Sequence, residues 1–334
     1  MNRKLIYNIL IGSALLLHGS CERRPLEDMC PDGGLIPIGT VWTVADITPQ
    51  NVTALFYSQD DGHLVMEHRF ENSPNSIQTY ADVPAGIYTV VVFNELRDQI
   101  KGIGIRGYEN FSTLEAFAMP NHDYKNRSND NDYVYEPDIL AAVTVHDIEV
   151  RVSEENEALI GLKPTRKVHR FNIVAHVKGL KNARMPALVD LPGVAESYGF
   201  KEDRNSRIVA TQQFTMNGRT YDNGSTKDGI ILTTVYTWGL LGEPPSEMYV
   251  ERDSPVQLDI LFMLVDAEKT LVRQVVDVTD LIEFQYEPHG AATLNVYVKL
   301  PDALPDVVPE GSGDSGFDSE VIDWDIIDVP LNAN

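Results

Sequence analysis

A glycine-rich stretch, residues 102–107, matches the G-x-G-x-x-G fingerprint of dinucleotide binding. The fingerprint works where a strand turns into a helix, because the first turn of that helix receives the pyrophosphate. Residues 108–112 begin no amphipathic helix, and no alternation of strands and helices surrounds the stretch. We therefore expect a glycine-rich loop among strands, and the sequence predicts no cofactor.

The serine and histidine residues form no catalytic or metal-binding pattern. Residues 313–316 read Gly-Asp-Ser-Gly, as in the nucleophile segment of trypsin-like proteases, but they lie in a linker without the strands that would hold a hydroxyl beside an imidazole. His146, His169 and His176 lack the HExxH spacing or an equivalent set of ligands. Acidic residues are so abundant that their number nominates no acid and base pair. The sequence predicts no catalytic residue and no metal site, with one alternative left open.

That alternative is calcium in the polar loop at residues 121–138. The loop supplies the oxygen atoms that calcium prefers, from Asn129, Asp130, Asn131, Asp132 and Asp138. They lack the ligand order of an EF-hand and its final Glu. We predict an exposed loop between strands.

Cys21 is the residue whose surroundings support a chemical role. Residues 1–21 consist of two positive residues, an apolar run and small residues before the thiol, which is the layout of a cleaved signal peptide. The apolar run, residues 5–17, is shorter than the roughly 18 residues of a membrane-spanning helix. Residues 17–21 resemble a bacterial lipoprotein box, with His18 where leucine is usual. The resemblance implies cleavage before Cys21 and lipid on its sulfur; a plain secretory signal is the alternative.

Composition limits the classes of partner and of scaffold. Arg3 and Lys4 are the only charges before Cys21, so their removal takes the formal net charge from −23 to −25. An acidic surface of this kind repels nucleic acid and anionic headgroups, so we expect no nucleic acid partner. Cys21 and Cys30 are the two cysteines, which excludes a disulfide scaffold. With 43% hydrophobic residues, the chain can build about two ordinary domains.

The elements of the first half alternate with period two, as strands do. Residues 52–56 and 64–70 flank an Asp-Asp-Gly turn and predict a β-hairpin. Residues 87–93 are apolar on both faces except at Thr89, which predicts a strand in the middle of a covered sheet. Residues 112–119 predict one short helix. Residues 139–152 and 158–162 complete a first all-β domain.

The second half begins after Pro164 with a strand whose apolar residues share one face. These residues are Phe171, Ile173, Ala175 and Val177. Further strands are predicted at residues 208–216, 230–238, 256–265, 271–278 and 292–300. Two β-sandwiches in series are the natural interpretation.

The last residues, 301–334, contain nine acidic residues and no Lys or Arg. After a Gly-Ser-Gly linker come branched residues and a Trp that alternate with Asp and then change phase by one residue, which indicates a bulge or a strand that moves between sheets. A disordered acidic tail suits residues 301–319, but it would leave the later apolar side chains in water. We therefore predict a strand-exchange segment at residues 321–331, formed by Ile322, Trp324, Ile326, Ile327, Val329 and Leu331.

Four features of the chain together resemble a Bacteroidetes family. They are the lipoprotein cysteine, residues 83–88 (Val-Pro-Ala-Gly-Ile-Tyr), the strand at residues 164–179 and the late Trp324 strand. This family is the fimbrillin-like and fimbrial anchor and assembly lipoproteins, including a related domain-of-unknown-function group. The resemblance implies two tandem transthyretin-like, Greek-key β-sandwiches. The expected divisions are residues 1–20 (signal peptide), 21–34 (lipidated flexible tether), 35–163 and 164–300 (sandwiches) and 301–334 (acidic linker and C-terminal strand).

The resemblance also implies a non-enzymatic lipoprotein of the outer membrane, which faces the cell surface and contacts other fimbrial subunits by strand addition. The C-terminal strand could be donated to another subunit, or it could fold back on its own domain. The alternative function is a glycan-binding lipoprotein for nutrient capture. It would need an exposed aromatic platform, for which the candidates are Tyr124, Tyr133, Tyr135, Trp238 and Tyr249.

Overall fold

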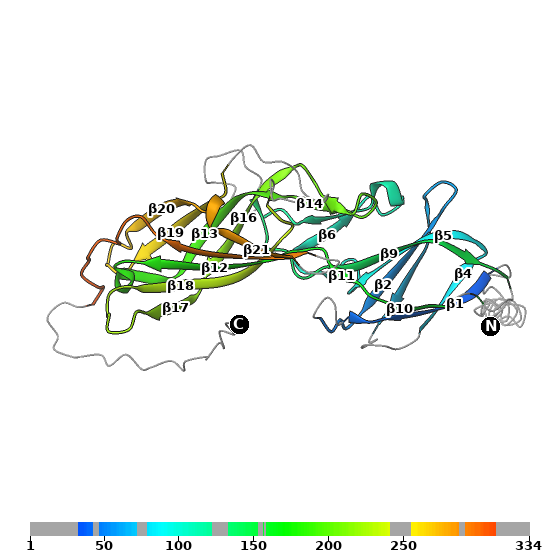
Figure 1. Ribbon diagram of the computed structural model, residues 1–334, viewed down its shortest axis with the longest axis horizontal. Coiled ribbons are helices and arrows are strands. Elements are labelled where there is room, and N and C mark those ends of the chain that lie inside the picture. Colours follow the sequence, from blue (N-terminus) through cyan, green and yellow to red (C-terminus); the bar gives the residue numbers. More distant parts are fainter. Residues whose placement is uncertain are drawn as a thin grey trace, which may run out of the picture.

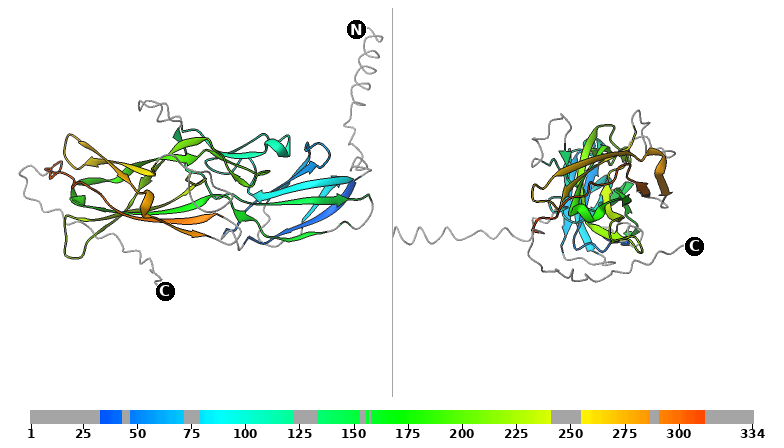
Figure 2. Two further views of the ribbon diagram at one scale, coloured as in Figure 1. Left: turned by 45° about the horizontal axis from the view of Figure 1, so that its top comes forward. Right: turned by 90° about the vertical axis from the view of Figure 1, so that its left-hand side faces the viewer.

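The computed structural model describes residues 33–42, 47–71, 79–121, 133–152, 156, 158–240, 255–286 and 291–311. These residues contain no α-helix and form 22 strands in five sheets. The expected all-β fold with packed sheets is confirmed. The two halves of the chain follow one another along the long axis of an elongated molecule (Figures 1 and 2).

Two sheets face each other in the N-terminal half. The β1 sheet has the order β10-β1-β4, and the β5 sheet has the order β11-β9-β5-β2-β3. The strands of the first are β1 (Gly33–Thr40), β4 (Thr79–Pro84) and β10 (Leu159–Leu162). Those of the second are β2 (Val52–Ser58), β3 (Leu64–Phe70), β5 (Gly86–Asn94), β9 (Ala141–Val150) and β11 (Thr165–Arg166). Ile36, Trp42, Phe56 and Val90 belong to the core between them.

The hairpin and the central strand of this half follow the sequence pattern. β2 pairs with β3 in antiparallel register around Asp61, whose side chain accepts a hydrogen bond from the His63 amide at 3.0 Å. β5 lies between β9 and β2, and its residues from Tyr88 to Asn94 are all buried. Both faces of β5 are covered, which is why its apolar run is nearly continuous.

Two five-stranded sheets form the C-terminal half. The β12 sheet has the order β17-β18-β12-β22-β21, and the β13 sheet has the order β20-β19-β13-β16-β8. The strands of the first are β12 (His169–Val177), β17 (Gly218–Tyr221), β18 (Gly229–Thr237), β21 (Ile282–Tyr286) and β22 (Ala292–Lys299). Those of the second are β8 (Tyr133–Val134), β13 (Ala183–Ala195), β16 (Val209–Met216), β19 (Gln257–Leu264) and β20 (Leu271–Asp277).

The alternation of β12 predicts its burial correctly. The four apolar residues of one face are all 0% exposed and lie in the core on the side of the β13 sheet: Phe171, Ile173, Ala175 and Val177.

The longest strand, β13, is not predicted by the sequence pattern. It contains two prolines and a glycine, which argue against a central strand. Its pairing shifts register on both sides, between Arg184 and Leu188 against β19 and near Pro192 against β16. These irregularities let a proline-containing strand lie in the middle of a sheet.

The fifth sheet corrects one prediction. The β7 sheet has the order β15-β14-β7-β6, with β6 (Ile103–Arg106), β7 (Glu115–Ala118), β14 (Ser197–Gly199) and β15 (Arg204–Asn205). The helix predicted at residues 112–119 is wrong: only the short 3-10 helix η3 (Phe111–Thr113) forms, and a strand follows. Ala116 and Ala118 alternate with half-buried neighbours, so tertiary burial with period two decides the conformation.

The β7 sheet joins the two halves of the chain. β7 pairs with β14, and β8 pairs with β16, so strands from before Pro164 are hydrogen-bonded to strands after it. One apolar cluster runs from the C-terminal sheets to Leu55, Val91 and Phe93 on the second face of the β5 sheet. The division of the chain at residue 164 stays a prediction.

Two segments expected to be linkers belong to the folded body where the structure describes them. Gly33 and Gly34, expected at the end of the tether, begin β1. Leu304 is 3% exposed, and its amide donates to the carbonyl oxygen of Lys178 at 2.9 Å. Two more 3-10 helices lie at the ends of strands, η5 (Leu180–Asn182) and η6 (Thr279–Leu281).

Candidate functional site

The predicted lipidation and strand-exchange residues lie outside the described residues. This holds for Cys21, for the segment of Ile322, Trp324, Ile326, Ile327, Val329 and Leu331, and for residues 313–316. It also holds for residues 129–132 of the calcium alternative and for Tyr124 and Tyr249 of the aromatic platform. In the part of the chain that is described, no helix is long and apolar enough to cross a lipid bilayer.

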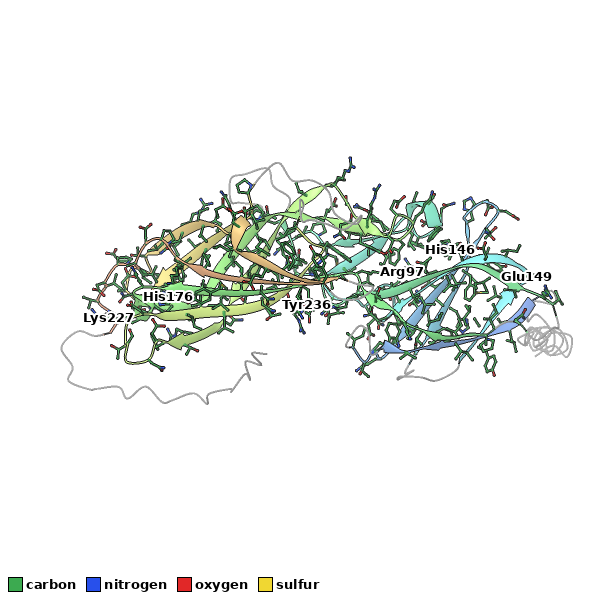
Figure 3. All side chains as sticks on the ribbon, viewed as in Figure 1. Arg97, His146, Glu149, His176, Lys227 and Tyr236 are labelled. Carbon is green, nitrogen blue, oxygen red and sulfur yellow. The ribbon has the colours of Figure 1, made fainter. Side chains whose placement is uncertain are left out.

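The three histidines singled out in the sequence are far apart. Figure 3 shows His146 and His176 in different halves of the molecule. His146 Nδ1 lies 3.1 Å from Thr89 Oγ1, and His176 Nε2 lies 2.8 Å from Asp222 Oδ2. His169 is fully buried, and burial lowers its pKa to about 3, with a smaller contribution from nearby Arg166. Across the described ranges, no three His, Cys, Asp or Glu side chains come together as a metal site would require.

The glycine fingerprint at residues 102–107 has a structural explanation. Strand β6 occupies its middle, and Gly102 and Gly107 adopt φ of 69° and 63° at the two ends. Gly104 lies opposite Phe117 on β7, and a Cβ on Gly104 would come within 2.4 Å of the Phe117 ring. The glycine makes room for an aromatic ring lying across the strand, and Arg106 lies over that ring at 4.9 Å.

The aromatic candidates that the structure describes form no platform. Trp238 is 1% exposed and stacks on Tyr198 with ring centroids 6.3 Å apart. Tyr133 donates a hydrogen bond from its hydroxyl to Asp190 Oδ2 at 3.1 Å, and Tyr135 is 40% exposed. Core packing accounts for Trp238, and Tyr133 belongs to strand β8, where its hydroxyl is held by Asp190.

The open strand edges are the first surface feature suited to binding another chain. An edge strand presents unpaired backbone groups on one side, and folded proteins often protect such edges with charge. β3 and β20 are edge strands of seven residues each. On β3, Glu67 pairs with Arg69 at 2.8 Å. On β20, the outward side chains include Leu271, 57% exposed, and Val275, 47% exposed, so β20 is the more apolar edge.

The second feature is an apolar patch on the outer face of the β13 sheet, next to β20. We define the apolar patch as Leu188, Leu261, Met263 and Leu271. Their neighbours along each strand point inward: Val189, Ile260 and Phe262 are 0% exposed. Leu188 lies opposite Leu261 and Met263 opposite Leu271 in the register, so the four side chains form one cluster. Met263 is 39% exposed. The strand alternation at residues 256–265 and 271–278 indicates which side chains of β19 and β20 share a face. It does not indicate the cluster, because Leu188 belongs to β13, a strand that the sequence does not predict.

Arginine side chains lie at the rim of the apolar patch. Arg184 is opposite Met263, and Arg273 is opposite Leu261. Arg273 donates to the Asp259 carboxylate, which raises the pKa of Arg273 above its ordinary value. Arg184 donates to the carboxylate of Glu310 near the end of the described chain. Farther along the face, Gln213 and Tyr133 both donate to Asp190, so the surface there is polar.

Comparison with known proteins identifies the family. Residues 20–215, more than half of the chain, match the model of a domain of unknown function, DUF5119. The chain belongs to the DUF5119 family. One relative of this DUF5119 protein in Bacteroides ovatus is 24% identical over 99% of both chains and is named "putative fimbrium anchoring subunit Fim4B". The expected resemblance to Bacteroidetes fimbrial anchor proteins is confirmed by these matches.

A solved structure shares the fold of the DUF5119 chain. It is described as the crystal structure of a "putative adhesin" from Bacteroides ovatus, and it matches with a TM-score of 0.55 at 20% identity. The match covers 86% of this chain and 99% of the other. At this identity the likeness supports the architecture of successive β-sheets.

Proposed function

We propose that this DUF5119 protein is a non-enzymatic cell-surface lipoprotein that anchors, assembles or decorates fimbriae. The observation that carries the proposal is the match along 99% of both chains to a protein named as a fimbrium anchoring subunit. An alignment over both full lengths covers the lipoprotein-like start, both halves of the body and the acidic end.

Two contacts perform the proposed role. Lipid on Cys21 holds the chain in the outer membrane, since more than one acyl chain on one residue gives stable attachment. Backbone pairing at an open strand edge joins the chain to other fimbrial subunits. Of the two seven-residue edges, β3 and β20, we favour β20, because Leu271 and Val275 supply apolar side chains beside its outer backbone groups.

Metabolic labelling with a palmitate analogue tests the membrane contact. The wild-type chain and Cys30→Ala, a matched control that removes the other cysteine, should both take up label and fractionate with the outer membrane. Cys21→Ala should take up none and be released from the membrane. Equal labelling of Cys21→Ala and wild type would refute the lipoprotein part of the proposal.

The subunit contact is tested by counting surface filaments on cells that express a chain lacking residues 321–334. If the tail joins subunits, filaments should be lost or shed while Cys21 labelling is unchanged. Normal filaments would show that residues 321–334 take no part in assembly, and Val275→Lys would then test the β20 edge.

A further inference from the structure

Two members of the apolar patch are exposed and the other two are partly exposed in the part of the chain that the structure describes. Met263 and Leu271 are 39% and 57% exposed, and Leu188 and Leu261 are partly exposed beside them. The chain as a whole carries a formal net charge of −23, so four clustered aliphatic side chains stand out from their surroundings. Large contiguous apolar patches on soluble proteins mark contact sites, and this cluster of four side chains across three strands is a candidate for one.

The described chain ends beside this patch. The Glu310 amide donates to the carbonyl oxygen of Val265 at 2.8 Å, and the Glu310 carboxylate accepts from Arg184. Arg184 is the register partner of Met263, a member of the patch. Figure 1 shows β19, β20 and the segment after β22 at the same end of the molecule. Gly311 therefore leaves the body within side-chain reach of the apolar patch.

The residues that follow have the composition of a segment that could cover it. Residues 312–334 contain six acidic residues and no Lys or Arg. Ile322, Trp324 and Ile326 alternate with Asp323 and Asp325, so an extended chain would carry apolar side chains on one side and carboxylates on the other. Residues 312–320 can span about 30 Å when extended, which is ample for a surface adjacent to Gly311.

We propose that residues 321–331 of the same chain lie over the apolar patch, with Ile322, Trp324 and Ile326 against it. Contact with the patch removes a Trp and two Ile side chains from water, and the acidic side of the segment stays solvated next to Arg184 and Arg273. A short linker gives an effective concentration of about a millimolar, so the chain's own tail outcompetes that of a second copy in dilute solution.

The proposed function gives this contact a consequence. The strand-exchange segment predicted from the sequence would then be held on its own body and kept from contacting another subunit. Only this consequence rests on the proposed function; the contact itself rests on the patch, on the position of Glu310 and on the composition of the tail.

The test measures the exposure of Trp324 in the full chain. Trp42 and Trp238 are each 1% exposed, so acrylamide should quench their fluorescence little. The part of the quenching that is lost in Trp324→Phe therefore reports on Trp324. We expect Trp324 to be shielded in the wild-type chain and several-fold more quenchable in Leu271→Asp and Met263→Asp. Leu35→Asp is the matched control, since Leu35 is 53% exposed on the β1 sheet and should leave the quenching unchanged.

Three results would overturn the proposal. The first is a Trp324 that is fully quenchable in the wild-type chain, and the second is equal quenching in Leu271→Asp and Leu35→Asp. The third is shielding of Trp324 that weakens on dilution, which would assign the contact to a second copy of the chain. Far-UV circular dichroism shows whether each variant folds, and Leu271→Ser replaces any Asp variant that does not. The readout is independent of Cys21 labelling and of filament counts, so this inference and the proposed function can fail separately.

Discussion

His169 shows how one buried residue ties folding to pH. Its Nδ1 atom accepts a hydrogen bond from the Ala292 amide at 3.1 Å, where β12 and β22 begin side by side. Gly239 adopts φ of 110°, and a Cβ there would come within 3.1 Å of the His169 ring. The ring is thus closely enclosed at the start of both strands, and protonation would place a charge where water does not reach.

We predict that this histidine weakens the fold as pH falls. Because its folded-state pKa of about 3 lies below the unfolded value of about 6.5, the unfolded chain binds a proton that the folded chain does not. Its contribution to stability is complete above pH 6.5 and is lost at about 1.4 kcal/mol per pH unit as pH falls from there toward 3. Urea denaturation between pH 5 and 7 measures this slope.

His169→Gln should remove that slope while lowering stability at pH 7. Glu136, whose pKa is raised by burial, is present in both chains, so the difference between the two slopes isolates His169. His63→Gln, an exposed position on the turn after β2, serves as the control. Identical slopes in the wild type and His169→Gln would contradict the prediction.

At the scale of elements, the segment after β22 is part of the C-terminal half. Asp306 accepts a hydrogen bond from Asn182 at 3.2 Å and pairs with Lys181 at 3.2 Å, which keeps the pKa of Asp306 below its ordinary value. Gly179 allows this approach, because it adopts φ of 74° and a Cβ on it would come within 2.6 Å of the Leu304 carbonyl oxygen. A left-handed backbone and a close backbone contact thus meet at one residue.

Gly179→Ala and Gly224→Ala separate these two effects. Gly224 has φ of 77°, but a Cβ there would meet nothing within 4 Å. Gly224→Ala should cost about 1 kcal/mol through backbone strain alone. Gly179→Ala should cost more, by about 1–3 kcal/mol, because the segment at Leu304 must move. Urea denaturation measures both, with hydrogen exchange at the Leu304 amide as the local readout; equal losses would exclude the steric contribution.

Sequence patterns predicted elements where burial alternates regularly, and they failed where long-range pairing decides. The faces of β12 and the β2–β3 hairpin follow from alternation and turn chemistry. The four residues of β7 carry too little periodicity to distinguish a strand from a helix. The prolines of β13 argue against a strand, yet pairing with β16 and β19 holds it in the sheet. Of the candidate site, the alternation of β19 and β20 was visible, but which sheet face stays uncovered depends on partners distant in sequence.

For the whole molecule, contacts between the halves predict one cooperative unit. Phe93 of β5 contacts Phe200 beyond β14, with ring centroids 6.3 Å apart. Arg106 of β6 pairs with Glu196 at 3.2 Å, and the Lys167 amide donates to the carbonyl oxygen of Leu140 at 2.8 Å. The continuous apolar cluster across the β7 sheet adds to these contacts.

Equilibrium unfolding should therefore show one transition for both halves. Trp42 reports on the core of the N-terminal sheets and Trp238 on the larger cluster. In a Trp324→Phe background, the variants Trp42→Phe and Trp238→Phe each leave one reporter. Each Trp→Phe change also lowers stability, so the fluorescence midpoint of a variant is compared with the circular dichroism midpoint of the same variant. After this correction, the midpoints reported by Trp42 and by Trp238 should coincide. Separate transitions in any one variant would show that the halves unfold independently.

The positions of Gly33 and Gly311 determine how the body would carry a pulling force. β1, which begins at Gly33, lies at one end of the long axis, and the segment after β22, in which the Glu310 amide donates to the Val265 carbonyl oxygen beyond β19, lies at the other (Figures 1 and 2). Tension between these points runs along the strands, so the ladder bonds of β1 with β4 and β10, which lie across that direction, are loaded together. Bonds loaded in shear must break as a group, whereas bonds at a peeled edge break singly. Tension applied between the two ends of the described chain would therefore load it in its more resistant direction.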